Sequence, residues 1–174
     1  MNENLNDKIR SVKLLLLDVD GVMTDGRITI DNNGVESKSF HVRDGHGIKL
    51  LQRAGVKVGI ITGRDSKVVL HRAAELGIEI IYQGMKVKME AFNRILEDEK
   101  LSANEVAYVG DDVVDLPVLR ESGFSVAVAD ASHVITPHVD YVTKKCGGRG
   151  AVREVTDLIL EGKGLWSEVM DRYF

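Results

Sequence analysis

The chain has 174 residues, the length of one ordinary domain, and is long enough to bury a core without disulfides. Its 23 Lys and Arg against 27 Asp and Glu give a net charge of −4, which argues against nucleic-acid binding because such domains usually carry a basic excess. The composition, 44% hydrophobic and 29% charged, excludes global disorder, and the single cysteine, Cys146, excludes a disulfide framework and a cysteine-based zinc site. The polar first residues and the lack of a long apolar run predict a soluble, cytoplasmic protein with no signal peptide and no contact with a membrane.

The first predicted element is a strand at 13–17, a continuous apolar run that ends in acidic residues. Such a run is typical of a strand in a parallel sheet that is covered on both faces. Two shorter segments follow, 27–30 and 35–41, separated by Asp31-Asn32-Asn33-Gly34. Because Asn-Gly between such segments is a strong hairpin signal, we expect a β-hairpin at about 26–41.

Helices and strands then alternate, and three of the helices are followed by a glycine in the left-handed position that commonly ends a helix: Gly55, Gly77 and Gly123. The predicted helices are 48–54, 68–76, 88–99 and 116–122. The predicted strands are 56–61, 78–82, 105–109, 124–128 and 139–142. This alternation predicts an α/β fold with a doubly wound parallel sheet.

The last part of the chain, a tail at about 146–174, is predicted to hold a flexible glycine-rich loop at 146–150 and two helices at 151–159 and 165–170. Each of these helices carries its apolar residues on one face. Since no repeat, linker or low-complexity segment divides the sequence, we expect one domain over residues 1–174.

Polar residues follow the predicted strands where each strand ends. Asp18 and Asp20 follow the first strand, Thr62 the strand at 56–61, Lys86 and Lys88 the strand at 78–82, and Asp111, Asp112 and Asp115 the strand at 105–109. The carboxyl ends of parallel strands meet at one edge of the sheet, where sites of this fold class form. A carboxylate cluster without paired His or Cys favours a hard divalent cation, with Mg²⁺ first, and therefore phosphoryl chemistry.

The same residues predict which side chain performs each part of this phosphoryl chemistry. Asp18 and Asp20 are two apart, so both side chains face the same way on an extended segment, and one can attack while the other transfers a proton. Thr62 can donate to a phosphoryl oxygen, and Lys88 can offset its charge. The choice of Lys88 over Lys86 rests only on spacing, and both remain open.

The combination of Asp18-Val-Asp-Gly-Val-x-Thr24, Thr62, Lys88 and Gly110-Asp-Asp-Val-Val-Asp115 resembles the haloacid dehalogenase superfamily of phosphatases. Further segments resemble the branch that hydrolyses 3-deoxy-D-manno-octulosonate (KDO) 8-phosphate, and this resemblance covers about residues 12–160. These segments are Phe40-His-Val-Arg-Asp-Gly45, Ile61-Thr-Gly-Arg-Asp65, Tyr82-Gln-Gly84 and Gly147-Gly-Arg-Gly-Ala-Val-Arg-Glu154. The last 14 residues lie outside this pattern.

The resemblance implies a Rossmann-like core and specific roles. Asp18 is expected to be the nucleophile that forms an aspartyl-phosphate, and Asp20 the acid and base. Mg²⁺ is expected on the Asp18 carboxylate, the Asp20 carbonyl and Asp111. Asp112 and Asp115 are expected on or beside the metal, with Asp115 orienting Lys88 or a metal-bound water. Thr62 and Lys88 are expected to stabilise the phosphoryl group.

The sequence leaves no room for a separate cap domain over this site. The resemblance implies a homotetramer instead, in which the hairpins associate and neighbouring subunits cover each site. The expected substrate is a sugar-acid phosphate, and Arg64, Arg72 and Arg149 are the candidates for its carboxylate. Arg64 favours the eight-carbon ester over a nine-carbon sialic-type acid 9-phosphate, which remains an alternative. A non-catalytic partner domain and a phosphate-accepting receiver domain are the others, and the order of the motifs argues against the receiver.

Overall fold

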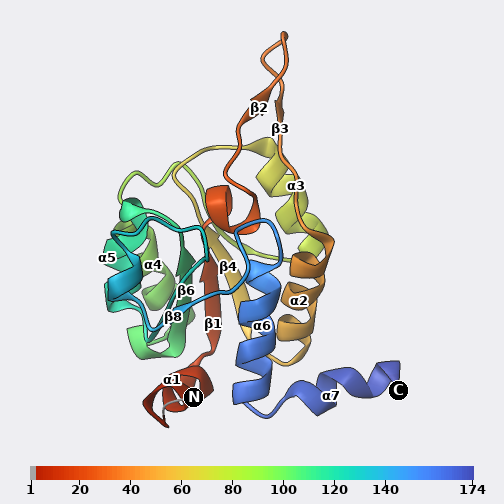
Figure 1. Cartoon of the computed structure of the whole chain (residues 1–174), viewed down its shortest axis with the longest axis vertical. Coiled ribbons are helices and arrows are strands. Elements are labelled where there is room, and N and C mark those ends of the chain that lie inside the picture. The colour runs from red at the N-terminus through yellow and green to blue at the C-terminus, as the bar shows by residue number, and fades with distance from the viewer. Residues whose placement is uncertain (1–2) are drawn as a thin grey trace.

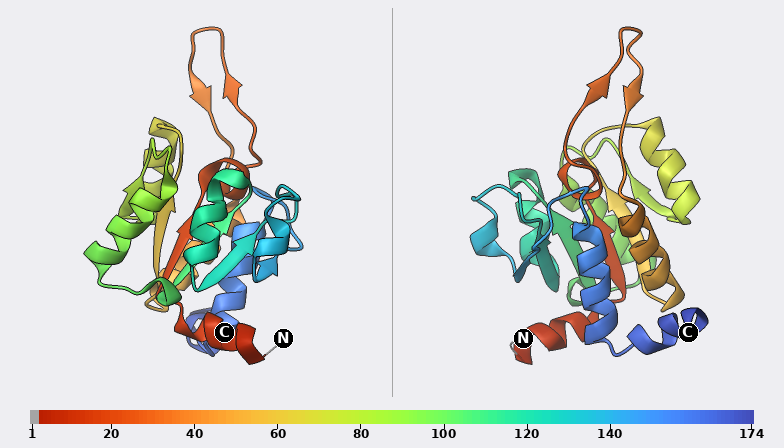
Figure 2. Two further views of the ribbon diagram at one scale, coloured as in Figure 1. Left: turned by 90° about the vertical axis from the view of Figure 1, so that its left-hand side faces the viewer. Right: turned by 45° about the vertical axis from the view of Figure 1, so that its right-hand side comes forward.

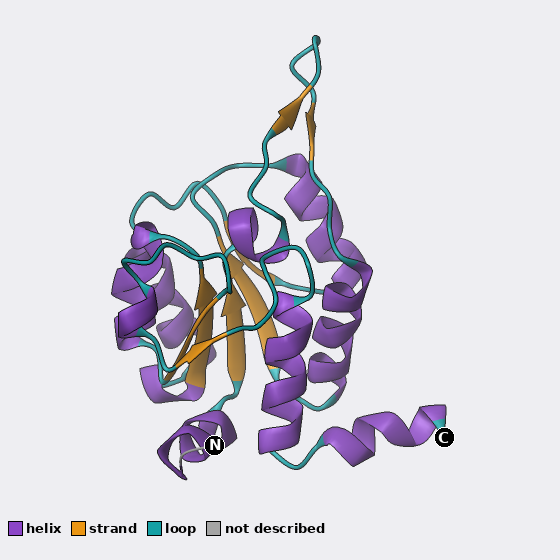
Figure 3. Ribbon diagram, in the orientation of Figure 1, coloured by secondary structure: helices purple, strands orange, loops and turns teal. Residues whose placement is uncertain are grey.

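The four leucines of strand β1 (Leu14–Leu17) are fully buried, because helices cover both faces of the sheet to which it belongs. The structure, a computed structural model, describes residues 3–174 and contains a six-stranded sheet in the order β5-β4-β1-β6-β7-β8, with every pair of neighbours parallel. Figures 1 and 3 show this sheet between two layers of helices. The other strands of the sheet are β4 (Lys57–Ile61), β5 (Ile80–Tyr82), β6 (Val106–Gly110), β7 (Phe124–Ala127) and β8 (Tyr141–Val142).

Each layer of helices buries the apolar face that the sequence pattern predicts. The helices are α1 (Glu3–Ser11), α2 (Val42–Arg53), α3 (Lys67–Leu76), α4 (Lys88–Glu99), α5 (Leu116–Glu121), α6 (Ala151–Gly162) and α7 (Trp166–Met170). Leu15 and Leu17 lie in a cluster with the buried residues of α2, α3 and α6, whereas Leu14 and Leu16 lie in a second cluster with those of α4 and α5. The predicted doubly wound parallel fold is therefore confirmed.

The predicted hairpin is present, with β2 (Thr29–Ile30) antiparallel to β3 (Glu36–Ser37). Its turn is closed by the Asp31 carboxylate, which accepts from the backbone N–H groups of Asn33 and Val35, both at 2.8 Å. The paired strands are two residues long, shorter than predicted. Figure 2 shows the hairpin projecting from the body of the molecule at the carboxyl edge of the sheet.

The predicted helix boundaries agree with the structure to within three residues, except at the start of α2. Helix α2 begins at Val42 rather than at residue 48, so it includes Gly45 and Gly47, which have weak helix propensity. Glycine is needed at position 47 for close packing, because a Cβ there would lie 2.2 Å from Thr156 Oγ1 of α6. Gly77 has the predicted left-handed conformation, with φ of 70°. Gly123 does not have it, and its Cβ would instead meet the backbone of Asn104 at 2.3 Å.

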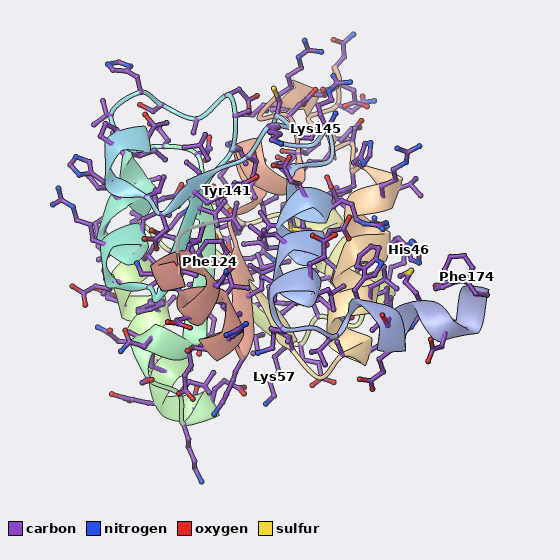
Figure 4. All side chains as sticks on the ribbon, turned by 60° about the horizontal axis from the view of Figure 1, so that its bottom comes forward. His46, Lys57, Phe124, Tyr141, Lys145 and Phe174 are labelled. Carbon is purple, nitrogen blue, oxygen red and sulfur yellow. The ribbon has the colours of Figure 1, made fainter. Side chains whose placement is uncertain are left out.

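The carboxyl-terminal segment lies at the end of the molecule opposite the hairpin (Figure 1). The Tyr173 hydroxyl accepts from Arg53 and is 3.0 Å from the ring nitrogen Nε2 of His46, both on α2. The side chain of Phe174, at the outer end of this segment, is fully exposed (Figure 4). Within residues 3–174, none of the helices is long and apolar enough to cross a membrane.

Candidate active site

The predicted polar residues meet at the carboxyl edge of the sheet, around a cavity of about 410 Å³. The cavity is lined by Asp18, Asp20, Thr62, Gly63, Arg64, Met85, Lys86, Lys88, Asp111, Asp112 and Val114. These residues come from the ends of β1, β4, β5 and β6 and from the start of α4, so segments far apart in sequence form one wall. The expected convergence of these side chains is confirmed, as this fold class requires.

Asp20 lies in the irregular helical turn η1 (Val19–Met23), and Asp18 is the single residue between this turn and the end of β1. Gly21 interrupts this turn with φ of 95°, a conformation that side chains rarely adopt. A Cβ at Gly21 would lie 2.2 Å from Asp111 Oδ2, so glycine is needed both for the turn and for the space that Asp111 occupies. The Asp-x-Asp-Gly motif thus brings the end of β1 against the end of β6.

Lys88 is the first residue of α4, and its ammonium group is buried within the acidic cluster. Its Nζ lies 2.9 Å from Asp18 Oδ1 and 2.6 Å from Asp115 Oδ1. Burial alone would lower the pKa of Lys88, but the Asp18 and Asp115 carboxylates raise it above its ordinary value, so the group stays charged. Lys86 is exposed at the cavity wall, and the geometry therefore favours Lys88 as the lysine of the site.

The fully buried Asp115 carboxylate is occupied by protein donors. Its Oδ1 accepts from Lys88 and, at 2.6 Å, from the Tyr108 hydroxyl. Its Oδ2 accepts from the backbone N–H groups of Asp111 and Asp112, at 3.0 and 3.2 Å. Of the two roles expected for Asp115, orientation of Lys88 is the one this geometry supports.

Asp18, Asp111 and Asp115 each offer a carboxylate oxygen, and these three atoms lie within 4.8 Å of one another. Burial raises the pKa of Asp18 to about 6, and burial together with repulsion from Asp18 and Asp115 raises the pKa of Asp111 to about 8. One lysine thus faces three carboxylates, and the excess negative charge and all-oxygen donor set fit a hard divalent cation. Since Asp115 is occupied, Asp18 and Asp111 are the side chains best placed to hold Mg²⁺.

Thr62 and Arg64 occupy the wall formed by the end of β4. Thr62 is buried, and the backbone N–H of Met85 donates to its carbonyl at 3.0 Å, which fixes the loop after β5 against it. The Arg64 guanidinium lies 3.0 Å from Glu36 Oε1 and 3.7 Å from Asp20 Oδ2. The Arg64 side chain is 45% exposed and lines the cavity.

Three further candidates are not at the centre of the site. Arg72 lies over the Phe40 ring and pairs with Glu75 at 2.7 Å, outside the cavity wall of this chain. Arg149 is 3.3 Å from Asp25 and lines a separate cavity of about 440 Å³. Asp112 lines the site cavity, but its carboxylate accepts from Val113 N at 2.8 Å and is outside the cluster of three. Within a single chain, neither Arg72 nor Arg149 lines the cavity of the candidate active site.

The glycine-rich segment at 146–150 is packed rather than loose, in contrast to the expectation of a flexible loop. Gly148 N donates to Val22 O and Gly147 N to Asp130 Oδ1, both at 2.9 Å. A Cβ at Gly147 would lie 1.6 Å from the Gly21 carbonyl oxygen. These glycines therefore allow the segment to pack directly on the turn that follows Asp18 and contains Asp20.

Sequence reasoning missed two residues of the site. Tyr108 lies in the apolar strand β6, and only its hydroxyl, placed at the end of a buried strand, could have indicated a polar role. Lys38, on the hairpin, contacts Asp20 with a side chain that is 1% exposed. Nothing in the local sequence distinguishes Lys38 from a surface lysine, because the burial of its side chain depends on how the hairpin folds back onto the body of the protein.

The fold and the acidic site are typical of the haloacid dehalogenase-like hydrolases, and the comparisons with known proteins support this class. Residues 41–123 match the family model described as haloacid dehalogenase-like hydrolase. The chain is also 51% identical to the 3-deoxy-D-manno-octulosonate 8-phosphate phosphatase of Escherichia coli K12, over 92% of this chain and 86% of the relative. The relative from Yersinia pestis is 48% identical over 91% of this chain and 84% of its own length.

A crystal structure of the corresponding phosphatase from Moraxella catarrhalis, in complex with a magnesium ion, a phosphate ion and a KDO molecule, superposes with a TM-score of 0.97. It is 37% identical, and each chain is covered completely. The cobalt-bound form of the Haemophilus influenzae phosphatase superposes with a TM-score of 0.88, at 44% identity over 90% of this chain and 92% of that one. This chain belongs to the family of 3-deoxy-D-manno-octulosonate 8-phosphate phosphatases, within the haloacid dehalogenase-like hydrolases.

Proposed function

We propose that this protein hydrolyses KDO 8-phosphate to KDO and inorganic phosphate, with Mg²⁺ as its cofactor. The observation that carries the proposal is the buried Lys88 ammonium on Asp18, inside a carboxylate cluster at the sheet edge, in a chain 51% identical to a phosphatase of that name. A carboxylate held by an ammonium at the floor of an open cavity is suited to attack a phosphate ester. Such a reaction would place the protein in the cytoplasmic synthesis of a lipopolysaccharide sugar.

Asp18 is the proposed nucleophile. A carboxylate oxygen of Asp18 attacks phosphorus, the bond between phosphorus and the sugar oxygen breaks, and an aspartyl-phosphate forms. Asp20 gives its proton to the leaving sugar oxygen. Asp20 then takes a proton from the water that attacks the aspartyl-phosphate, so that phosphate leaves and both carboxyl groups return to their initial states.

Lys88 and Thr62 are the proposed stabilisers of the phosphoryl group during both steps. The fixed positive charge of Lys88 faces the oxygens of the transferring group without needing to rearrange, which is the main source of catalysis in phosphoryl transfer. Asp115 is fixed by three other donors, the Tyr108 hydroxyl and the backbone N–H groups of Asp111 and Asp112, and so keeps Lys88 in place. A Mg²⁺ held by Asp18, the Asp20 carbonyl and Asp111 would supply further charge neutralisation of the phosphate oxygens.

The sugar-acid carboxylate requires a cation away from the phosphate, and Arg64 is the proposed partner. Arg64 lines the cavity and is 45% exposed, and the planar fork of its guanidinium suits a carboxylate. Arg72 and Arg149 stand outside the cavity of their own chain. Either would contact a substrate only if it served a neighbouring subunit.

We also propose that the hairpin mediates assembly into a homotetramer. Three apolar side chains of the hairpin are more than half exposed, Ile28 (53%), Ile30 (58%) and Val35 (58%), although the hairpin projects from the body of the molecule. Association would remove this apolar surface from water. Size-exclusion chromatography with light scattering should give four times the chain mass at micromolar concentration, and a monomer would contradict the proposal.

The function is tested by phosphate release from KDO 8-phosphate and from a nine-carbon acid 9-phosphate at matched concentrations with Mg²⁺. We expect a strong preference for the eight-carbon ester, and we expect turnover to stop when the metal is chelated. Preference for the nine-carbon ester would keep the mechanism and change the substrate. Turnover of neither ester would leave a non-catalytic partner domain as the better explanation. Asp18→Asn, which keeps the shape of the side chain, is the inactive control.

A further inference from the structure

The hairpin sends one charged side chain back into the body of the protein. Most hairpin residues are exposed, but the Lys38 side chain is only 1% exposed. Its ammonium contacts Asp20 Oδ1 and lies 3.5 Å from Glu36 Oε1. Burying an ammonium group costs several kcal/mol unless carboxylates compensate for the lost water, so this position depends on its two partners.

Glu36 anchors this arrangement to the core. Its Oε2 accepts from the Ser66 hydroxyl at 2.6 Å, and its Oε1 accepts from Arg64 at 3.0 Å. The hydrogen bond from Ser66, together with those from Arg64 and Lys38, holds the pKa of Glu36 below its ordinary value, so this carboxylate stays charged. The Lys38 ammonium therefore lies between two carboxylates, that of Glu36, which is fixed to the core, and that of Asp20.

The contact with Lys38 gives the two carboxylate oxygens of Asp20 different surroundings. Oδ1 contacts Lys38, whereas Oδ2 accepts no hydrogen bond from the described residues and lies 3.7 Å from Arg64, beyond hydrogen-bond distance. Oδ2 is thus the oxygen that is free to meet a substrate group in the cavity. Without Lys38, the Asp20 side chain could rotate and exchange its two oxygens.

We propose that Lys38 is a positioning residue, which holds the Asp20 carboxyl with Oδ2 directed at the leaving oxygen of the substrate. This inference rests on the proposed function, in which Asp20 gives the proton to that oxygen. Lys38 acts through Asp20 and is not among the residues that line the cavity. Its importance therefore depends on how strongly the leaving group needs a proton.

The test compares two esters with Lys38→Met, which replaces the ammonium with an unbranched apolar group suited to a buried site. KDO 8-phosphate releases an alkoxide that requires a proton, whereas p-nitrophenyl phosphate releases a stable phenolate that does not. The value of kcat/KM reports only the steps up to departure of the leaving group. We expect Lys38→Met to lower kcat/KM about 100-fold for the sugar ester and less than about threefold for the aryl ester, in line with general-acid contributions.

Four further variants make the comparison specific. Lys38→Arg keeps the charge and should restore most of the activity on the sugar ester. Asp20→Asn should show the same selective loss, and the Asp20→Asn/Lys38→Met double variant should be no worse than Asp20→Asn alone if Lys38 acts through Asp20. Arg27→Met removes an 80% exposed cation from the same hairpin and should leave both esters unaffected.

Equal losses on the two esters would overturn the inference and indicate a structural role, as would additive losses in the double variant. Should Lys38→Met not fold, as judged by circular dichroism, Lys38→Gln replaces it in the same comparison. If the unmodified protein hydrolysed neither ester, the proposed function itself would fail. That outcome is distinct from equal losses in a working enzyme.

Discussion

The Lys88 ammonium lies 2.9 Å from Oδ1 of Asp18, so the proposed nucleophile and the proposed phosphate-binding cation form a buried ion pair. Asp115 holds the same ammonium at 2.6 Å from the other side. The lysine is therefore fixed before a substrate arrives and needs no rearrangement to meet the charge of a phosphoryl group.

Lys88→Met should lower kcat at least about 100-fold, because it removes preorganised charge from the transition state. Lys86→Met should change kcat by less than about threefold, since Lys86 is exposed and stands only at the cavity wall. Steady-state kinetics on the sugar ester measures both values. The reverse result, with Lys86 essential and Lys88 dispensable, would mean that the wrong lysine has been assigned.

Asp115→Asn should destabilise the protein by about 3–5 kcal/mol, the usual cost of breaking a buried ion pair. Asp115 accepts from four donors, and an amide NH₂ would face two of them in either orientation. Urea unfolding measures the loss. Asp112→Asn is the matched control, because its exposed cap to Val113 N can be kept by the amide oxygen and stability should stay within about 0.5 kcal/mol. A weaker affinity for Mg²⁺ in Asp112→Asn would instead identify Asp112 as a ligand.

The affinity for Mg²⁺ should fall as the pH is lowered below 8. In the cation-free site, burial and the neighbouring carboxylates raise the pKa of Asp111 to about 8 and burial raises that of Asp18 to about 6, so Mg²⁺ must displace protons. One displaced proton weakens the apparent affinity about tenfold per pH unit below 8. Calorimetric titration at pH 6, 7 and 8 measures the apparent affinity for Mg²⁺. An affinity that does not depend on pH would contradict the prediction.

The same shifts predict how the metal-free protein responds to pH. Because the folded state holds protons more tightly than the unfolded state, these two groups make the protein less stable as the pH rises from about 4 to 8. The stabilisation given by Mg²⁺ should therefore grow with pH over this range. Thermal unfolding with and without Mg²⁺ isolates the effect from other titrating groups, and a constant increment would count against it.

Gly147→Ala should lower kcat about 10- to 100-fold, because its Cβ would displace the Gly21 carbonyl and with it the turn that carries Asp20. Gly123→Ala is the matched control. Neither glycine has a positive φ, and a Cβ at Gly123 also meets backbone, at 2.3 Å, but far from the site. Both variants should unfold at lower temperature, while only Gly147→Ala should lose kcat per folded molecule. Equal kcat losses would show that Gly147 has no particular effect on the active site.

Local patterns were sufficient for most of the architecture and for the central residues of the site. The continuous apolar run of β1 requires burial on both faces, and helix α4 begins and ends at the predicted residues. The convergence of Asp18, Asp20, Thr62, Lys88 and Asp111 also follows from sequence, since strand ends in a parallel sheet must meet at one edge. The start of α2 was missed because Gly45 and Gly47 weaken local helix propensity, and only close packing against α3 and α6 explains them.

The sequence by itself determined which chemical groups stand at the carboxyl edge of the sheet, because order along the chain and strand direction are local properties. Only the tertiary structure decided how these groups pair. It buries Lys88 rather than Lys86 against Asp18, and it brings Lys38 into contact with Asp20. It also fills both carboxylate oxygens of Asp115 with hydrogen bonds from protein donors. It also placed Arg72 and Arg149 outside the cavity of their own chain. These outcomes depend on burial and on contacts between residues distant in the chain, which local spacing does not encode.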